Sequence, residues 1–218
     1  MARIKYTRQS GIINIKEFRD NKILIVGCGA VGSFTAISLA KMGLTKFLLY
    51  DDDKVEAHNL PNQLFPEDAI GIDKALAVAT YMQQYNSEVN VIPFIKKFGI
   101  NTEHDCSIVI CCVDTMRARK QIFINSKKNK VQLFIDTRMA GTQGQVYTVD
   151  MEDKKQIANY ETNLFSDEEA VQERCTERSI IYTVLGIASL VCNQLVKAFK
   201  NEELRNYIVL DYSVPQMM

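Results

Sequence analysis

The chain of 218 residues has no excess of either charge, and we expect no apolar run in it to be long enough to cross a bilayer. Its 26 basic residues balance 26 acidic ones, so the formal net charge is zero. Nucleic-acid binding through phosphate neutralisation needs a basic surplus, and the composition argues against it. A membrane span needs about 20 apolar residues, and the N-terminus also lacks the apolar segment of a signal peptide. We expect a soluble, cytoplasmic protein with no nucleic-acid or membrane partner.

The cysteines lack the spacing of a metal site. None of the six forms a C-x-x-C pair, so a zinc site of four thiolates has no support and we expect no structural zinc. Cys111 and Cys112 lie in an apolar run and are predicted to pack as small hydrophobic side chains. In a reducing compartment, free thiols are expected.

Apolar runs alternate with amphipathic segments through the first part of the chain, and no internal repeat is present. This alternation is typical of a Rossmann-like, doubly wound α/β sheet that is mostly parallel. The central runs are continuously apolar, as expected where helices cover both faces of a sheet. We predict strands over 22–27, 46–50, 89–95, 107–112 and 131–136, and helices over 30–42, 73–86 and 115–128.

The pattern changes after about residue 143. Residues 145–150 alternate with a period of two, which predicts an antiparallel strand, and a last strand is predicted over 207–211. The polar segment 151–178 lacks a strong period and is a candidate mobile crossover loop. We expect one domain over 1–218 with an N-terminal arm over 1–20. A helix over 179–200 is predicted to face the core with Ile180, Val184, Ile187, Leu190, Val191, Leu195 and Phe199.

Residues 22–33 contain the sequence G-x-G-x-x-G between a predicted strand and a predicted helix. Gly27 permits a tight turn, Gly29 permits close approach of a nucleotide, and Gly32 lets the helix pack on the strand. Asp51 follows Gly32 by 19 residues, where a carboxylate can accept both hydroxyl groups of a ribose. These residues predict a nucleotide site, and by themselves they fit NAD and ATP equally well.

Further polar residues stand at the ends of other predicted elements. Lys74 opens a helix and Asp114 ends a strand, so both can face the crevice above the glycine turn. A lysine can neutralise phosphates, a carboxylate can hold Mg²⁺ against phosphate oxygens, and the Asn59 amide can donate to a phosphate. Taken singly, Lys74 also fits a solvated helix face and Asp114 a helix cap. Together they suit attack at phosphorus better than hydride transfer.

These motifs occur in a fixed order with others along the chain: Arg8-Gln9, Asp51-x-Asp53, His58-Asn-Leu-Pro-Asn-Gln63, Gly71-x-x-Lys74 and Cys112-Val-Asp114. In this order they closely resemble the E1-like activating enzyme superfamily, the ThiF/MoeB/HesA adenylyltransferases, over almost the whole chain. The resemblance implies ATP- and Mg²⁺-dependent adenylylation of a C-terminal carboxylate, with release of pyrophosphate. The substrate would be a small ubiquitin-like or sulfur-carrier protein, usually ending in Gly-Gly.

The resemblance also implies roles for individual residues. Asp51 would hold the ribose, Asn59 and Lys74 the phosphates, and Asp114 the Mg²⁺ ion. Arg8 matches an arginine that enters the partner subunit's ATP site in homodimeric members, so a homodimer is expected. The implied cofactor-binding set is Gly27, Gly29, Gly32, Asp51, Asp53, Asn59, Asn62, Gln63 and Lys74, and the implied catalytic set is Arg8, Lys74, Asp114 and Cys175.

Cys175 aligns with a position at which some relatives carry a reactive cysteine, just before the last long helix. The start of a helix, with Arg174 and Arg178 nearby, lowers the pKa of a thiol. The thiolate could then take the activated acyl group as a thioester or acyl persulfide. Some members of the family use no cysteine, and a structural role for Cys175 is an equal alternative.

The chain departs from the family pattern at Asn62, where the family usually has a phosphate-binding arginine. Losing such a charge-assisted contact costs on the order of a few kcal/mol. Arg138, just beyond the predicted strand that ends at Asp136, is a candidate replacement. Asn62 also leaves open a non-catalytic subunit that binds nucleotide and a partner. A nicotinamide-dependent oxidoreductase is a further alternative, although the length leaves little room for its substrate domain.

Overall fold

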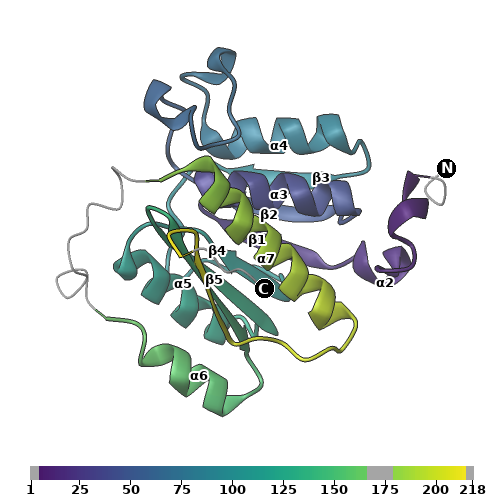
Figure 1. Cartoon of the computed structure of the whole chain (residues 1–218), viewed down its shortest axis with the longest axis vertical. Helices are drawn as coiled ribbons and strands as arrows, with labels where there is room; N and C mark the ends of the chain where they lie inside the picture. Colours follow the sequence, from purple (N-terminus) through teal and green to yellow (C-terminus); the bar gives the residue numbers. More distant parts are fainter. Residues whose placement is uncertain (1–4, 166–178, 215–218) are drawn as a thin grey trace.

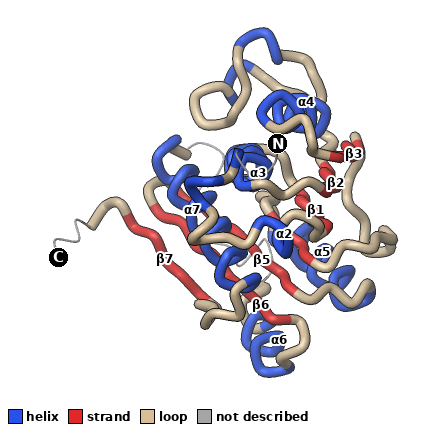
Figure 2. Tube along the Cα trace, turned by 90° about the vertical axis from the view of Figure 1, so that its right-hand side faces the viewer, coloured by secondary structure: helices blue, strands red, loops and turns tan. Residues whose placement is uncertain are grey.

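The computed structural model describes residues 5–165 and 179–214. Within these residues one sheet has the strand order β3-β2-β1-β4-β5-β6-β7, with β3 and β7 at its two edges (Figure 2). Strands β1 to β5 run parallel, and β6 and β7 are antiparallel to their neighbours. The predicted fold class is confirmed. The strands are β1 (Lys22–Val26), β2 (Lys46–Tyr50), β3 (Asn90–Phe94), β4 (Ile108–Cys111), β5 (Leu133–Ala140), β6 (Gln143–Asp150) and β7 (Tyr207–Asp211).

Helices cover both faces of the sheet (Figure 1). On one face lie α3 (Ala30–Met42), α4 (Lys74–Tyr85) and α7 (Ile181–Phe199), and on the other α5 (Met116–Lys128) and α6 (Lys154–Glu161). Each face has its own hydrophobic core. In β1, Ile23 and Ile25 face the core on the side of α3, α4 and α7, and Leu24 and Val26 face the core on the side of α5 and α6. The strand has no polar alternation because both of its faces are buried. Four short helices complete the described chain: η1 (Thr7–Gln9), α2 (Ile15–Phe18), η2 (Ala57–Asn59) and η3 (Glu67–Ala69).

Helix α6 lies within the predicted mobile loop over 151–178, and that prediction is wrong for residues 154–161. The carboxylate of Asp153 caps the helix by accepting the N–H of Lys155 at 2.8 Å and of Gln156 at 3.3 Å. Tyr160 is 2% exposed and belongs to the hydrophobic core between α5 and the sheet. Ile157 and Leu164 pack against the same core. Residues 157, 160 and 164 are spaced by three and four, as on one face of a helix. The polar residues between them make this spacing hard to recognise in the sequence. Residues 166–178 lie outside the described part of the chain.

Helix α7 agrees with the helix predicted over 179–200. Its 19 residues and mean hydropathy of 1.4 make it long and apolar enough, by length and composition alone, to cross a membrane. The expectation that the chain holds no such segment is therefore corrected. In the structure α7 packs against α3 and β6, and Val184, Ile187, Val191 and Leu195 are fully buried. Ile180, predicted to face the core, is 42% exposed because it precedes the first helical turn.

The described part of the N-terminal arm packs against the far ends of two helices. Gln9 donates from Nε2 to the carbonyl of Met42, the last residue of α3, at 2.6 Å. Asn86, which follows α4, donates from Nδ2 to the hydroxyl of Tyr6 at 3.2 Å. In a βα unit, the helix starts at the carboxyl edge of the sheet and finishes at the amino edge. The arm, with the exposed Arg8, therefore lies at the amino edge (Figure 1).

Candidate functional site

The glycine turn joins β1 to α3. Gly27 has a φ of +93°, and its N–H donates to the carbonyl of Tyr50 at 2.8 Å. A β-carbon on Gly27 would lie 2.5 Å from the carbonyl oxygen of Cys112. One on Gly32 would lie 1.8 Å from the carbonyl oxygen of Gly27. Both positions therefore exclude a side chain, the first for the turn and the second for the packing of helix on strand.

Gly29 is spared such crowding. A β-carbon there would meet only the Gln63 side chain, at 3.8 Å. Gly29 is the N-cap of α3, and no side chain caps this helix. The first N–H groups of a helix lack partners within the helix and carry partial positive charge. Bare backbone at this helix start is therefore suited to an incoming phosphate.

Three parallel strands end at the same level and bring distant segments together. Val26, the last residue of β1, lies opposite Tyr50 of β2 and Cys111 of β4. The residues that follow these strand ends, including Asp51 and Asp114, therefore lie at the carboxyl edge with the glycine turn. Crevices at this edge are where open α/β sheets bind ligands.

Asp51 is hydrogen-bonded to the glycine turn itself. Its Oδ2 accepts the N–H of Cys28 at 2.6 Å, and its Oδ1 accepts the N–H of Asp53 at 2.9 Å. Burial raises the pKa of Asp51, and the two hydrogen bonds partly oppose that rise. Each carboxylate oxygen offers two acceptor positions, so each keeps one for a ribose hydroxyl.

Lys74 is the first residue of α4 and is 7% exposed, so it is not a solvated lysine on a helix face. Its Nζ lies 2.9 Å from Oδ2 of Asp53, and its N–H donates to the carbonyl of Asp53 at 2.9 Å. Lys54 and Asp73, paired at 2.9 Å, join the same two segments. The charge of Lys74 also acts to lower the pKa of Asp51. The start of α4 is thus held beside the end of β2.

Beyond Asp51 and Asp53, the loop after β2 carries three more of the predicted ligands. Asn59 is 5% exposed, and its Oδ1 accepts the N–H of Glu56 at 2.9 Å in the reciprocal cap of η2. Asn62 donates from Nδ2 to Oγ of Ser179, close to the start of α7. Oδ1 of Asn62 and Oε1 of Gln63 are buried without a hydrogen-bond partner in the described chain. Two acceptors are therefore left for donors on a ligand or water.

Asp114 is exposed between β4 and α5, and it is not the helix cap. Thr115 caps α5, its Oγ1 accepting the N–H of Ala118 at 3.3 Å. Among the described residues the Asp114 carboxylate has no hydrogen bond or ion pair, and no group of three His, Cys, Asp or Glu side chains could hold a metal. Mg²⁺ in nucleotide sites takes one or two carboxylates together with phosphate oxygens. One unengaged carboxylate fits that requirement.

A buried ionic cluster lies next to the Asp114 segment and consists of Arg119, Asp136, Arg138 and Tyr160. Arg119 pairs with Asp136 and donates to the carbonyls of Thr137, at 2.7 Å, and Val113. The second oxygen of Asp136 accepts from Nε of Arg138 at 2.9 Å and from the hydroxyl of Tyr160 at 3.0 Å. Burial opposes the charged form of each arginine, but Asp136 outweighs it and the pKa of both is raised. The sequence indicated Arg138 but not Tyr160, because α6 was not predicted.

Two predicted catalytic residues are not brought to this edge within the described chain. Arg8 lies at the amino edge, and Cys175 falls outside the described residues. Cys28 sits in the glycine turn, but burial raises the pKa of its thiol well above the usual value. Cys111 is fully buried and packs as predicted, and Cys112 is partly buried. These described thiols are packing residues.

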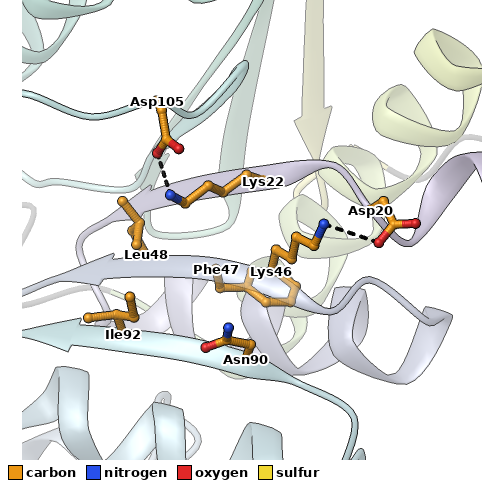
Figure 3. A pocket seen from close by; sticks show the side chains of 8 residues that line it. All are labelled: Asp20, Lys22, Lys46, Phe47, Leu48, Asn90, Ile92 and Asp105. Carbon is orange, nitrogen blue, oxygen red and sulfur yellow. Dashed lines mark hydrogen bonds and ion pairs between the residues drawn. The ribbon is translucent and has the colours of Figure 1, made fainter.

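A hollow of about 410 Å³ lies at the amino ends of β1, β2 and β3 (Figure 3). Two ion pairs border it, Lys22 with Asp105 and Lys46 with Asp20. Because parallel strands start at this edge, the hollow lies opposite the glycine turn. It contains none of the predicted site residues.

Known proteins resemble this chain in sequence. The ThiF family model matches residues 5–217. Ubiquitin-like modifier-activating enzyme 5 of Bombyx mori is 31% identical over 137 residues, which cover 56% of this chain and 35% of that protein. The Aedes aegypti protein of the same name is 30% identical over 149 residues, covering 61% and 37%. The matched region thus spans about a third of the length of these curated relatives.

Solved structures resemble it in fold. Escherichia coli MccB with ATP is 17% identical, with a TM-score of 0.73 over 97% of this chain and 69% of that one. E. coli tRNA N6-threonylcarbamoyladenosine dehydratase, TcdA, is 21% identical, with a TM-score of 0.72 over 91% and 95%. PaaA is 18% identical, with a TM-score of 0.75 over 97% and 80%. With the family model matched over nearly all of its length and this fold, the chain belongs to the ThiF family.

Proposed function

We propose that the chain is an ATP-dependent adenylyltransferase that activates the C-terminal carboxylate of a small ubiquitin-like or sulfur-carrier protein and releases pyrophosphate. One observation carries the proposal: Gly29, Lys74 and Asp114 lie at one edge of the sheet. Strands β1, β2 and β4 end there at one level, and Asp53, just after β2, holds Lys74 beside them. A bare helix start, an ammonium group and an unengaged carboxylate suit a Mg²⁺-bound triphosphate. Relatives named as modifier-activating enzymes, and MccB crystallised with ATP and with MccA, support it.

The proposed reaction joins a carboxylate oxygen of the carrier to the α-phosphorus of ATP while the bond from that phosphorus to pyrophosphate breaks. The carboxylate is already ionised at neutral pH, so no general base is needed. Mg²⁺ would supply positive charge to the phosphate oxygens. Asp51 would hold the ribose, Lys74 and the amide nitrogen of Asn59 the phosphates, and Asp114 the metal. Positioning and electrostatics would then provide most of the rate.

The proposed enzyme is a homodimer in which Arg8 serves the partner's site. Gln9, the neighbour of Arg8 in the chain, is hydrogen-bonded to Met42, the last residue of α3, whereas the glycine turn lies just before the first residue of that helix. The helix has 13 residues, so its ends are about 20 Å apart at 1.5 Å per residue. No arginine side chain spans that distance, and Arg8 therefore cannot reach the nucleotide edge of its own chain.

The test of the activity is ATP–pyrophosphate exchange, measured with a small protein that ends in Gly-Gly and has first been identified by co-purification with the chain. We expect exchange that requires the carrier and falls at least about 100-fold in Asp114→Ala. Asp105→Ala removes an exposed carboxylate at the amino edge and is the matched control, expected to behave as wild type. Exchange that survives in Asp114→Ala, or is absent from the wild type with its carrier, would overturn the mechanism.

A second candidate is a non-catalytic subunit that binds nucleotide and a partner, and Asn62 favours it. An amide stands where the family usually has an arginine, and it donates to Ser179. Thermal melts with Mg²⁺ and ATP complement the exchange assay, since a ligand at 100 times its Kd adds about 2.7 kcal/mol. Stabilisation by ATP without exchange favours the non-catalytic subunit. Stronger stabilisation by NAD than by ATP favours the oxidoreductase instead.

A further inference from the structure

The cluster of Arg119, Asp136, Arg138 and Tyr160 holds more positive than negative charge. In the described chain, Arg119 and Arg138 both pair with Asp136 and with no other acidic side chain. Two guanidinium groups and one carboxylate leave a net charge of +1. The three charged side chains are 6%, 11% and 0% exposed, in the order Arg119, Arg138, Asp136. A buried charge without a counter-charge is unfavourable, so a bound anion would stabilise the cluster by neutralising its net charge.

One nitrogen of Arg138 has no partner among the described residues. Its Nε donates to Asp136 at 2.9 Å, its Nη1 donates to the carbonyl of Asn163 at 3.1 Å, and its guanidinium lies 4.3 Å from the ring centre of Tyr147. Its Nη2 is buried and has no hydrogen-bond partner in the part of the chain described. A guanidinium that is fixed through two nitrogens and has a third unengaged is preorganised to donate to an oxyanion.

The cluster borders the carboxyl edge of the sheet. Cys111, the last residue of β4, lies opposite Asp136 of β5, so Arg138 stands two residues beyond the end of β4. Residues two apart in a strand share a face, and Arg138 therefore projects on the same side as Asp136. Arg119 joins the cluster to the carbonyl of the residue that precedes Asp114. The unbalanced charge thus lies next to the segment proposed to hold Mg²⁺.

We infer that Arg138 binds an oxyanion of the reacting groups, a nucleotide phosphate or the carrier's carboxylate, and that Asp136 and Tyr160 are positioning residues that orient its guanidinium. The identity of the anion rests on the proposed function. The inference also gives the site a second cation besides Lys74, although Asn62 is neutral and its amide is bonded to Ser179.

Calorimetric titration of Arg138→Gln tests the inference with three probes: Mg²⁺-bound ATP, adenosine and inorganic pyrophosphate. If the anion is a phosphate, the Kd values of ATP and pyrophosphate rise about 10- to 100-fold and that of adenosine is unchanged. If it is the carboxylate, ATP binds as in wild type and the KM for the carrier in pyrophosphate exchange rises by a similar factor. Arg138→Lys keeps the positive charge but loses the planar guanidinium with its paired N–H donors. Its affinities should therefore lie between those of the wild type and those of Arg138→Gln. Unchanged binding of ATP, pyrophosphate and carrier would overturn the inference.

The controls separate local binding from net charge and from folding. Lys46→Gln removes one positive charge at the amino edge, where Lys46 pairs with Asp20 at 3.2 Å, and should leave every affinity unchanged. An equal loss of affinity in Lys46→Gln would contradict a local site. Arg138→Gln leaves Arg119 paired with Asp136, so a cooperative melt without ligand is expected.

Tyr160→Phe keeps the charge and the buried ring and removes only the hydroxyl that donates to Asp136. It should weaken anion binding about 3-fold, and it remains informative if Arg138→Gln does not fold. Unaltered anion affinity in a folded Tyr160→Phe would refute the positioning role. If the wild type neither binds ATP nor catalyses exchange, the proposed function is wrong. The anion site of Arg138 can still be tested separately, because the titration with pyrophosphate needs no nucleotide.

Discussion

At the scale of single residues, the three glycines of the turn have different roles in folding and in ligand binding. Gly27 and Gly32 are required by the fold, because a β-carbon at either would overlap backbone carbonyl oxygens. Gly29 has room for a side chain and leaves a helix start open at the carboxyl edge. The same motif therefore combines two positions needed for folding with one that suits a ligand.

This difference gives a prediction that compares Gly32→Ala with Gly29→Ala. Gly32→Ala forces α3 away from β1 and should lower the free energy of unfolding by about 1–3 kcal/mol. Gly29→Ala should destabilise the fold less than Gly32→Ala, because its β-carbon meets no backbone atom, and should weaken ATP binding. Urea unfolding and titration with Mg²⁺-bound ATP measure the two effects. The assignment is wrong if Gly29→Ala is as destabilising as Gly32→Ala.

At the scale of elements, continuous apolar runs and glycine punctuation were sufficient to predict all seven strands and the long helices α3, α4, α5 and α7. Helix α6 was missed, although its cap at Asp153 and its apolar spacing at 157, 160 and 164 are local signals. Three apolar side chains in a polar segment are weak evidence until a core is known to lie beneath them. Without α6, the burial of Tyr160 could not be foreseen.

The cap of α6 predicts a pH dependence. The N–H groups of Lys155 and Gln156 lower the pKa of Asp153, so its charged form is favoured in the folded chain. Stability from this group is present above its unfolded pKa of about 3.9 and is lost as the pH falls through the lower folded value. Asp153→Asn keeps a capping oxygen at every pH and should lose less stability than wild type between pH 6 and pH 3. Urea unfolding across that range tests this, with Glu152→Gln as the control for one lost acidic charge.

At the scale of the whole molecule, the proposed site residues are divided between the two edges of the parallel strands. The carboxyl edge gathers the glycine turn, Asp51, Lys74 and Asp114, while the amino edge holds the N-terminal arm and Arg8. One copy of the chain therefore cannot bring all the proposed residues together. A second copy with the opposite orientation could supply Arg8 across a two-fold axis.

Mixing variants tests this arrangement. Arg8→Ala and Asp114→Ala should each lack pyrophosphate exchange, because each homodimer has two defective sites. After mixing and subunit exchange, half of the dimers are mixed and each has one intact site, so activity should return to about a quarter of wild type. Mixed chains that stay inactive, with exchange of subunits shown by differently tagged copies, would rule out a contribution of Arg8 to the partner's site.

The sequence by itself determined the fold class, the order of the strands and the ordered residues Gly27, Asp51, Lys74 and Asp114, because these depend on local spacing and on apolar runs buried on both faces. The end of β5 was predicted wrongly: the strand continues past Asp136 to Ala140, and Arg138 lies within it. The tertiary structure alone decided which distant polar groups meet. Arg119 and Arg138 share Asp136 with Tyr160 of α6, and Asn62 binds Ser179. Such contacts follow from strand register and side-chain direction across the sheet, and no local period encodes them. For the same reason, only the packing of the arm against α3 and α4 placed Arg8 at the far edge.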